Sequence, residues 1–262
     1  MTFMHGMTAN RTVLLTALVL LLSTLSWAKK DSDSKAQPDV VKRLHNASEV
    51  LSEIMAAPDK GIPGDVLRDA KCVVVVPSMV KFAVGIGGHY GKGFATCRTA
   101  SSWSAPAPVL LTGGSWGLQF GGQAVDLVML VMNQKGVDHL LSSKFAIGAD
   151  ASAAAGPVGR QAAAGTDWKM KAEILTYSRA RGVFAGVDLT GSVIKQDKDE
   201  TAVLYGKILP FQDILSGKVA PPQPAQEFLA TLEKYASATT QQGNLQKPNL
   251  MTTARWAVSR PL

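Results

Sequence analysis

The sequence predicts an α+β fold in which helices flank a bent, glycine-rich antiparallel β-sheet or barrel-like core. One observation is that apolar segments between Cys72 and Gly206 contain paired or alternating glycines, as in Val84–Gly88 and Trp116–Gly122. Glycine inside a strand marks a bulge, a bend or the close approach of another backbone. A second is that segments with helical periodicity precede and follow this region. With 262 residues, 46% of them hydrophobic, the chain can also bury a substantial core.

Residues 1–28 are predicted to form a secretory signal peptide. Arg11 precedes an uncharged, mainly apolar run from Val13 to Leu25, and small residues occupy the cleavage positions that end at Ala28. Residues 29–38 are polar and should form a flexible leader after cleavage. An uncleaved N-terminal anchor is the alternative, although the run is short for a bilayer span. We therefore expect the mature protein to be periplasmic or secreted.

The mature chain is expected to be modestly basic. Removing the signal segment takes away Arg11 and no acidic residue, so the formal charge falls from +7 to +6. This charge favours approach to phospholipid head groups, but it is also common in proteins that merely stay soluble. Charge alone therefore does not separate these functions, and no nucleic-acid partner is expected.

The chain has two cysteines, Cys72 and Cys97, and each falls on a predicted strand. An exported chain folds in an oxidising compartment, which favours a disulfide between them. The alternative is a pair of buried free thiols, since burial is the usual state of free cysteine.

Helices are expected before the sheet. From Asp39 to near Pro58, apolar residues recur at helical spacing while charged residues occupy the other face, a pattern typical of an amphipathic helix. A short helix is predicted from Pro63 to Ala70, because proline is favoured in the first turn and Asp65 complements the positive helix end.

Strands dominate the next region, with turn signals at Gly91–Gly93 and Gly113–Gly114. The predicted strands are Cys72–Val76, Lys81–Gly88, Gly93–Arg98, Ala107–Leu111, Ser115–Gly121, Val125–Met132, Ala172–Arg179 and Val183–Lys195. The predicted later helices are Lys135–Ser142, Glu200–Tyr205, Pro210–Leu215 and Gln223–Ala236. Together these elements indicate one domain over residues 39–236, followed by a weakly ordered tail over residues 237–262.

A serine hydrolase is the weakest of the functional hypotheses. Gly113–Gly117 fits the nucleophile-elbow pattern around Ser115, but the residues that follow are strand-like rather than helical. A triad would need His139, which is the one histidine after Ser115. A glycine-rich β-turn is the better interpretation, so no enzymatic activity is expected.

Phosphate and metal sites are also disfavoured. Gly87–Gly93 is similar to a phosphate loop, but lacks the leading glycine and the magnesium-binding hydroxyl residue. A tight hairpin with His89 exposed at its tip is the preferred interpretation. The histidines are scattered along the sequence, so no metal or other cofactor is expected.

Several motifs in a fixed order resemble the SYLF domain family. They cover roughly Val40 to Gly206 and are Lys71–Pro77, Val84–Gly93, Trp103–Pro106, Gly117–Gly122, Gly148–Ser152, Gly156–Arg160 and Tyr177–Val187. The resemblance implies a lipid-binding domain. Eukaryotic members are phosphoinositide-binding modules tied to actin and membrane traffic, and bacterial relatives are exported envelope proteins.

Two groups of cations are candidate lipid contacts. Lys42 and Arg43 on the first helix would meet phosphates while the apolar face of the helix enters the head-group region. The alternative is that this face packs on the protein's own core, as in most globular proteins. The second group is Arg160, Arg179 and Arg181, which could equally be ordinary solvated or ion-paired arginines.

The leading functional hypothesis is a non-enzymatic module of the bacterial periplasm or cell envelope that binds a phospholipid surface or lipid ligand. The alternative is a structural or protein-interaction component whose partners are envelope proteins.

Overall fold

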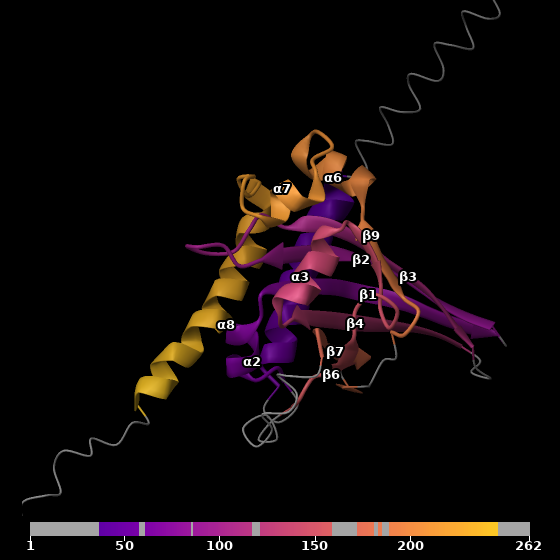
Figure 1. Ribbon diagram of the computed structural model, residues 1–262, viewed down its shortest axis with the longest axis horizontal. Coiled ribbons are helices and arrows are strands. Elements are labelled where there is room, and N and C mark those ends of the chain that lie inside the picture. The colour runs from indigo at the N-terminus through magenta and orange to yellow at the C-terminus, as the bar shows by residue number, and fades with distance from the viewer. Residues whose placement is uncertain are drawn as a thin grey trace, which may run out of the picture.

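Four long antiparallel strands form the centre of the structure (Figure 1). The computed structural model describes residues 37–57, 61–84, 86–116, 121–158, 172–180, 183–184 and 189–245. The four strands are β1 (Cys72–Val84), β2 (Ile86–Cys97), β3 (Ala107–Trp116) and β4 (Gly121–Val131). They lie side by side in the order β3-β2-β1-β4, and each neighbouring pair is antiparallel.

Five shorter strands extend this centre to a nine-stranded sheet. The order is β5-β9-β3-β2-β1-β4-β7-β6, with β8 paired to β7, and β6 and β7 form the one parallel pair between named strands. Their bounds are β5 (Lys144–Ala146), β6 (Ala153–Ala155), β7 (Ile174–Ala180), β8 (Val183–Phe184) and β9 (Val193–Gln196). The curled sheet and its helices confirm the predicted α+β fold with a bent, barrel-like core.

Two of the predicted turns are wrong, because the glycines there allow close packing instead. Gly91 and Gly93 lie inside β2, where a Cβ on Gly93 would sit 2.1 Å from the carbonyl oxygen of Val75. Gly113 and Gly114 likewise lie inside β3. The central strands are therefore longer than the sequence predicted, and β1 is continuous across a bulge near Pro77.

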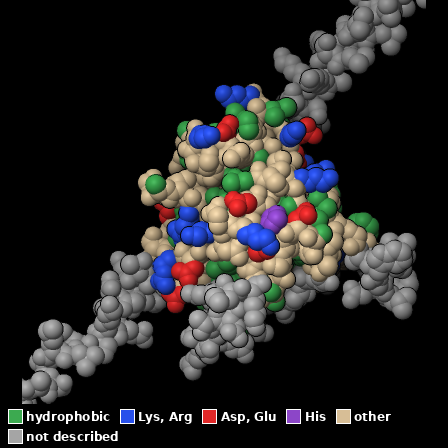
Figure 2. Space-filling model, in the orientation of Figure 1, with side chains coloured by type: hydrophobic (Ala, Val, Ile, Leu, Met, Phe, Trp, Pro, Cys, Tyr) green, Lys and Arg blue, Asp and Glu red, His purple; other side chains and the backbone are tan. Residues whose placement is uncertain are grey.

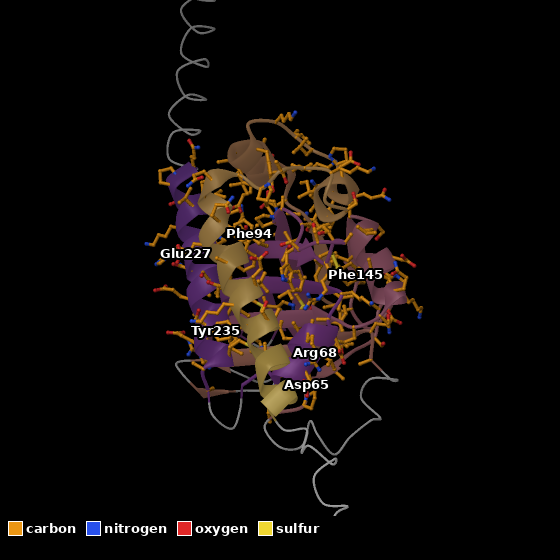
Figure 3. All side chains as sticks on the ribbon, turned by 90° about the vertical axis from the view of Figure 1, so that its left-hand side faces the viewer. Asp65, Arg68, Phe94, Phe145, Glu227 and Tyr235 are labelled. Carbon is orange, nitrogen blue, oxygen red and sulfur yellow. A yellow bond between two sulfur atoms is a disulfide. The ribbon has the colours of Figure 1, made fainter. Side chains whose placement is uncertain are left out.

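Helices cover both faces of the sheet. One face packs against the helix over residues 37–55, termed the leading helix, and against α2 (Gly64–Asp69) and α8 (Gln226–Leu245). Figure 3 shows the leading helix and α8 side by side, with Phe94 near them and Phe145 on the other side of the molecule. The opposite face packs against α3 (Gln134–Leu141) and α7 (Phe211–Leu215).

Most predicted helices are confirmed. The leading helix, α2, α3 and α7 occupy the expected segments, as does α6 (Lys198–Tyr205). The last helix continues to Leu245, beyond its predicted end and into the expected tail. The strand expected over Val183–Lys195 is not continuous, since residues 189–192 between β8 and β9 are not in a strand. The predicted signal peptide lies outside the described residues.

The predicted disulfide is confirmed. Cys72 and Cys97 are directly opposite each other in the β1–β2 pair and their sulfur atoms are bonded. Both cysteines are buried at the ends of their strands. The bond therefore ties the two strands together at one end of the sheet.

Candidate functional site

A groove of about 310 Å³ lies where the first turns of the leading helix meet the bulged part of β1 and the middle of β2. The helix contributes Asp39, Lys42, Arg43 and Asn46, and the strands contribute Pro77, Ser78, Val80, Tyr90, Gly91 and Lys92. Sequence reasoning placed Lys42 and Arg43 in a site. It missed the strand residues, of which Tyr90, Gly91 and Lys92 come from a motif interpreted as a hairpin turn.

The bulge in β1 shapes the floor of the groove. The β1–β4 register shifts between Val76 and Met79, and Ser78 has φ of +52°, a left-handed conformation that is uncommon for a side-chain-bearing residue. The backbone N–H of Ser78 donates a hydrogen bond to Asp126 Oδ1 at 2.9 Å. A bulge turns the strand that follows it, and here Val80 is left half exposed beside the helix end.

Two of the three groove cations are held by carboxylates. Arg43 Nη1 lies 2.5 Å from Glu200 Oε1, and Lys92 Nζ lies 3.0 Å from both Glu200 Oε1 and Asp197 Oδ2. Burial lowers the pKa of Lys92, but the hydrogen bonds it donates to Asp197 and Glu200 outweigh this and raise the pKa above its ordinary value. Both carboxylates belong to the start of α6, where Asp197 also caps the helix through the N–H of Glu200.

Lys42 and Asp39 remain at the rim of the groove. Both side chains are exposed, and neither makes an ion pair within the part of the chain that the structure describes. They lie on the same side of the leading helix, one turn apart. The groove therefore presents one ammonium group and one carboxylate to solvent, which suits a ligand carrying both signs of charge.

The apolar face of the leading helix is not available for a ligand. Val40, Leu44 and Ile54 are each 2% exposed or less and belong to the core between this helix and the sheet. This confirms the alternative in which the helix packs on its own protein. Apolar contact near the groove comes instead from Val80 and Tyr90, which are 48% and 45% exposed.

Arg179 lies in an ion-paired clasp rather than at an open surface. From β7 it pairs with Glu53 of the leading helix and lies 3.6 Å from Asp126 Oδ2 on β4. Since Asp126 also holds the N–H of Ser78, the clasp connects the helix to the bulge. Direct lipid contact by Arg179 stays a prediction, and Arg160 and Arg181 lie outside the described residues.

His89 is buried, so its predicted position at an exposed hairpin tip is wrong. It is 4% exposed within β2, and its Nε2 lies 2.7 Å from Ser192 Oγ. A Cβ on Gly113 would sit 2.3 Å from the same nitrogen, so this glycine makes room for the ring. The turn between β1 and β2 comes earlier in the chain than expected.

Ser115 and His139 lie at opposite ends of the sheet. The ladder connects Ser115 through Gly87 and Ala83 to Gly121, at the start of β4. His139 lies on α3, with Nε2 3.6 Å from Glu173 Oε2, near the other end of β4. Because β4 has 11 residues, these ends are roughly 35 Å apart at the usual rise per residue. The geometry does not bring the proposed triad together.

Neither a metal cluster nor a membrane-spanning helix is found in the described ranges. No three or more His, Cys, Asp or Glu side chains there are grouped to hold an ion. No helix there is both long and apolar enough to cross a bilayer.

Comparison with known proteins identifies the family of this domain. A family model described as "Ysc84: Las17-binding protein actin regulator" matches residues 112–235, from β3 into α8. The chain carries a Ysc84, or SYLF, family domain. The predicted resemblance is thereby confirmed, while the groove residues precede the matched segment and are argued from their geometry.

Relatives of this SYLF chain include longer eukaryotic proteins. The SH3 domain-containing YSC84-like protein 1 of Rattus norvegicus is 29% identical over 216 residues, covering 82% of this chain and 62% of the relative. LAS seventeen-binding protein 3 of Saccharomyces cerevisiae is 31% identical over 182 residues, covering 68% and 39%. The chain thus spans less than two thirds of either relative. Their names describe domains and binding, not reactions.

Proposed function

We propose that this SYLF chain is a non-enzymatic module of the bacterial periplasm or cell envelope that binds phospholipid surfaces. The observation that carries the proposal is the groove, whose exposed Lys42 and Asp39 adjoin the exposed apolar side chains of Val80 and Tyr90. Charged groups beside aromatic and aliphatic surface match the boundary between lipid head groups and acyl chains.

The charges of the groove favour a phospholipid head group over a simple anion. Lys42 would meet the phosphate, and Asp39 would meet an amine such as that of phosphatidylethanolamine. Arg43 and Lys92 are already matched by Glu200 and Asp197, so they contribute less net charge. Figure 2 likewise shows acidic and basic side chains interspersed over the face it displays. Binding should therefore depend on salt less steeply than binding to a uniformly basic surface.

Export is supported by two independent features of the chain. The apolar run from Val13 to Leu25 has the length and flanking residues of a signal peptide that is cleaved near Ala28. The disulfide between Cys72 and Cys97 suits the oxidising conditions of the periplasm. A phospholipid surface is present in that compartment, which makes it a suitable partner.

A protein-interaction role in the envelope is the second candidate. It is favoured by the descriptions of the family and of the yeast relative, which refer to binding of Las17. Such a role predicts saturable binding to envelope proteins and none to pure lipid vesicles.

Co-sedimentation with vesicles of phosphatidylethanolamine and phosphatidylglycerol tests the proposal. The informative variant is Lys42→Glu, because this side chain is exposed and has no carboxylate partner among the described residues. Arg43→Glu would also break the contact with Glu200 and so confuse binding with folding. Lys144→Glu is the matched control, since it makes the same charge change at an exposed position on the edge strand β5.

The proposal predicts that Lys42→Glu weakens vesicle binding several-fold while Lys144→Glu does not. A wild-type protein that sediments with none of these vesicles would overturn it and favour the protein-interaction role. Equal loss in both variants would show that only overall charge matters, and would remove the groove as the site.

A further inference from the structure

The four central strands end together beyond the helices. Val84 pairs with Ile86, Ile86 with Trp116, and Ala83 with Gly121, so β1, β2, β3 and β4 all reach the same end of the sheet. In Figure 1 this end projects to the right, away from the leading helix, α3 and α8. We call it the open end.

The open end exposes large apolar side chains on the face that the leading helix covers elsewhere. Val80 pairs with Tyr90, and Phe82 pairs with Gly88. Phe82 is 55% exposed, and its ring lies over Gly88, where an added Cβ would be 2.7 Å from Cζ. Since side chains two residues apart share a face, Val80 and Phe82 form one continuous apolar strip.

The described part of the open end has no charged side chains. The first charged side chains along the strands lie at the level of the groove. Residues 82–84, 86–88, 113–116 and 121–124 contain no acidic, basic or histidine residue. Lys81, Lys92 and Asp126 are the first charged residues behind them on β1, β2 and β4. From Phe82 to Val84 the charge-free end of β1 spans roughly 7 Å at the usual rise per residue. This falls within the roughly 5–10 Å to which interfacial helices enter a bilayer.

We propose that the protein docks on the phospholipid bilayer end-on, with the open end entering the head-group region and the groove charges at its outer boundary. This inference rests on the phospholipid-binding function proposed above. Its basis is the match between a charge-free apolar end, a belt of both charges behind it, and the polarity profile of a bilayer. The leading helix is excluded as the inserting element because its apolar face is already buried.

The strand edges limit the depth of docking. The pairing of β3 with β9 stops at Thr112, and that of β4 with β7 stops at Asp126, among the residues that the structure describes. The outer edges of β3 and β4 beyond these points carry backbone groups that no described strand pairs. Unpaired backbone groups are costly in hydrocarbon, so the end should stop among the head groups and not cross the bilayer.

A pair of labels tests this orientation. Nitroxide labels on Ala124→Cys and Ala56→Cys report on the open end and on the far end of the leading helix, and both alanines are exposed. The native cysteines are bonded to each other, so each variant has one thiol for labelling. Accessibility to oxygen and to a water-soluble relaxation agent is measured with and without phosphatidylethanolamine–phosphatidylglycerol vesicles, together with co-sedimentation of each labelled protein.

The expected result is that both proteins sediment with vesicles, the label at position 124 moves into lipid, and the label at position 56 stays in water. Sedimentation with protection at position 56 alone, or at neither position, would overturn the end-on orientation while leaving phospholipid binding intact. Immobilisation at position 124 without vesicles would indicate a second copy of the chain on this surface, which also overturns it. Wild-type protein that fails to sediment would remove both the orientation and the function on which it rests.

Discussion

The two ends of the four central strands differ in what covers them. At the end formed by Cys72, Cys97 and Val131, termed the closed end, a disulfide joins β1 and β2, and the side chains are buried under helices. At the open end, Phe82 is more than half exposed and no described helix covers it. The same strands therefore stabilise the fold at one end and leave apolar surface exposed at the other.

The largest expected effect is a difference in unfolding free energy between a substitution in the covered part of the sheet and one at the open end. Phe94 is fully buried against Phe228 of α8, so Phe94→Ala should cost about 3–5 kcal/mol of unfolding free energy. Phe82→Ala, at the open end, should cost less than about 1 kcal/mol because that side chain is already largely in water. Urea denaturation of both variants measures the difference. Equal losses would contradict the division of the sheet into two ends.

Removing the disulfide should act on stability alone. In the chain-entropy model, a bond between cysteines 25 residues apart is worth about 3 kcal/mol, so Cys72→Ala/Cys97→Ala should lower the unfolding free energy by that amount. Vesicle binding by the fraction that remains folded should be unchanged, because the bond lies at the closed end. Denaturation and co-sedimentation of the same preparation test both statements. Weaker vesicle binding by the folded variant would contradict the prediction that the disulfide acts on stability alone.

The Arg179 clasp lies between the two ends and is expected to affect both stability and binding. Arg179→Ala leaves Asp126 without its cation and should cost roughly 1–2 kcal/mol, between the values for exposed and buried pairs. Because Asp126 orients the bulge, vesicle binding should also weaken, without any contact between Arg179 and lipid. Arg68→Ala removes an exposed pair with Asp65 and is the control, with little effect on either property. A stability loss with normal binding would separate the clasp from the groove.

The smallest effect concerns the contact between the leading helix and α8. The hydrogen bond and charge of Glu227, with a contribution from Glu49, raise the pKa of His45 above its ordinary value. A raised pKa means that this stabilisation is fully present below the unfolded value near 6.5 and disappears as pH rises through the folded pKa. Thermal melts from acidic to alkaline pH should show a slight extra stability on the acidic side that is smaller in Glu227→Gln, where Glu49 alone remains near the ring. An identical pH profile for the variant would show that the pair contributes nothing.

Local patterns were enough to predict the fold class, the helices and the disulfide. The leading helix follows from its apolar spacing, and the pairing of Cys72 with Cys97 follows from strand positions in a chain that is expected to be exported. The lengths of the central strands could not be predicted from these local patterns. Glycines at positions 91 and 93 resemble turn signals, yet Gly93 is needed because the backbone of Val75 passes so close to it.

The open end could not be identified from the sequence because the bulge changes which face each β1 residue occupies. Val73 and Val75 face the leading helix, and strict alternation would place residues 79 and 81 on that face. The extra residue at the bulge places Val80 and Phe82 there instead. The sequence left open whether Arg179 contacts lipid or forms ion pairs, because its partners Glu53 and Asp126 are distant from it in the sequence.

The most direct test of the open end is a vesicle-partition curve for Phe82→Asp beside that for Ile208→Asp. Ile208 is 63% exposed, lies after α6, and receives the same kind of substitution away from the open end. If the open end binds lipid, Phe82→Asp should weaken partition by about tenfold or more, because a buried aromatic side chain is worth at least that factor, and Ile208→Asp should match the wild type. If the folded Phe82→Asp variant partitioned onto vesicles as strongly as the wild type, the open end would not be the lipid-binding surface.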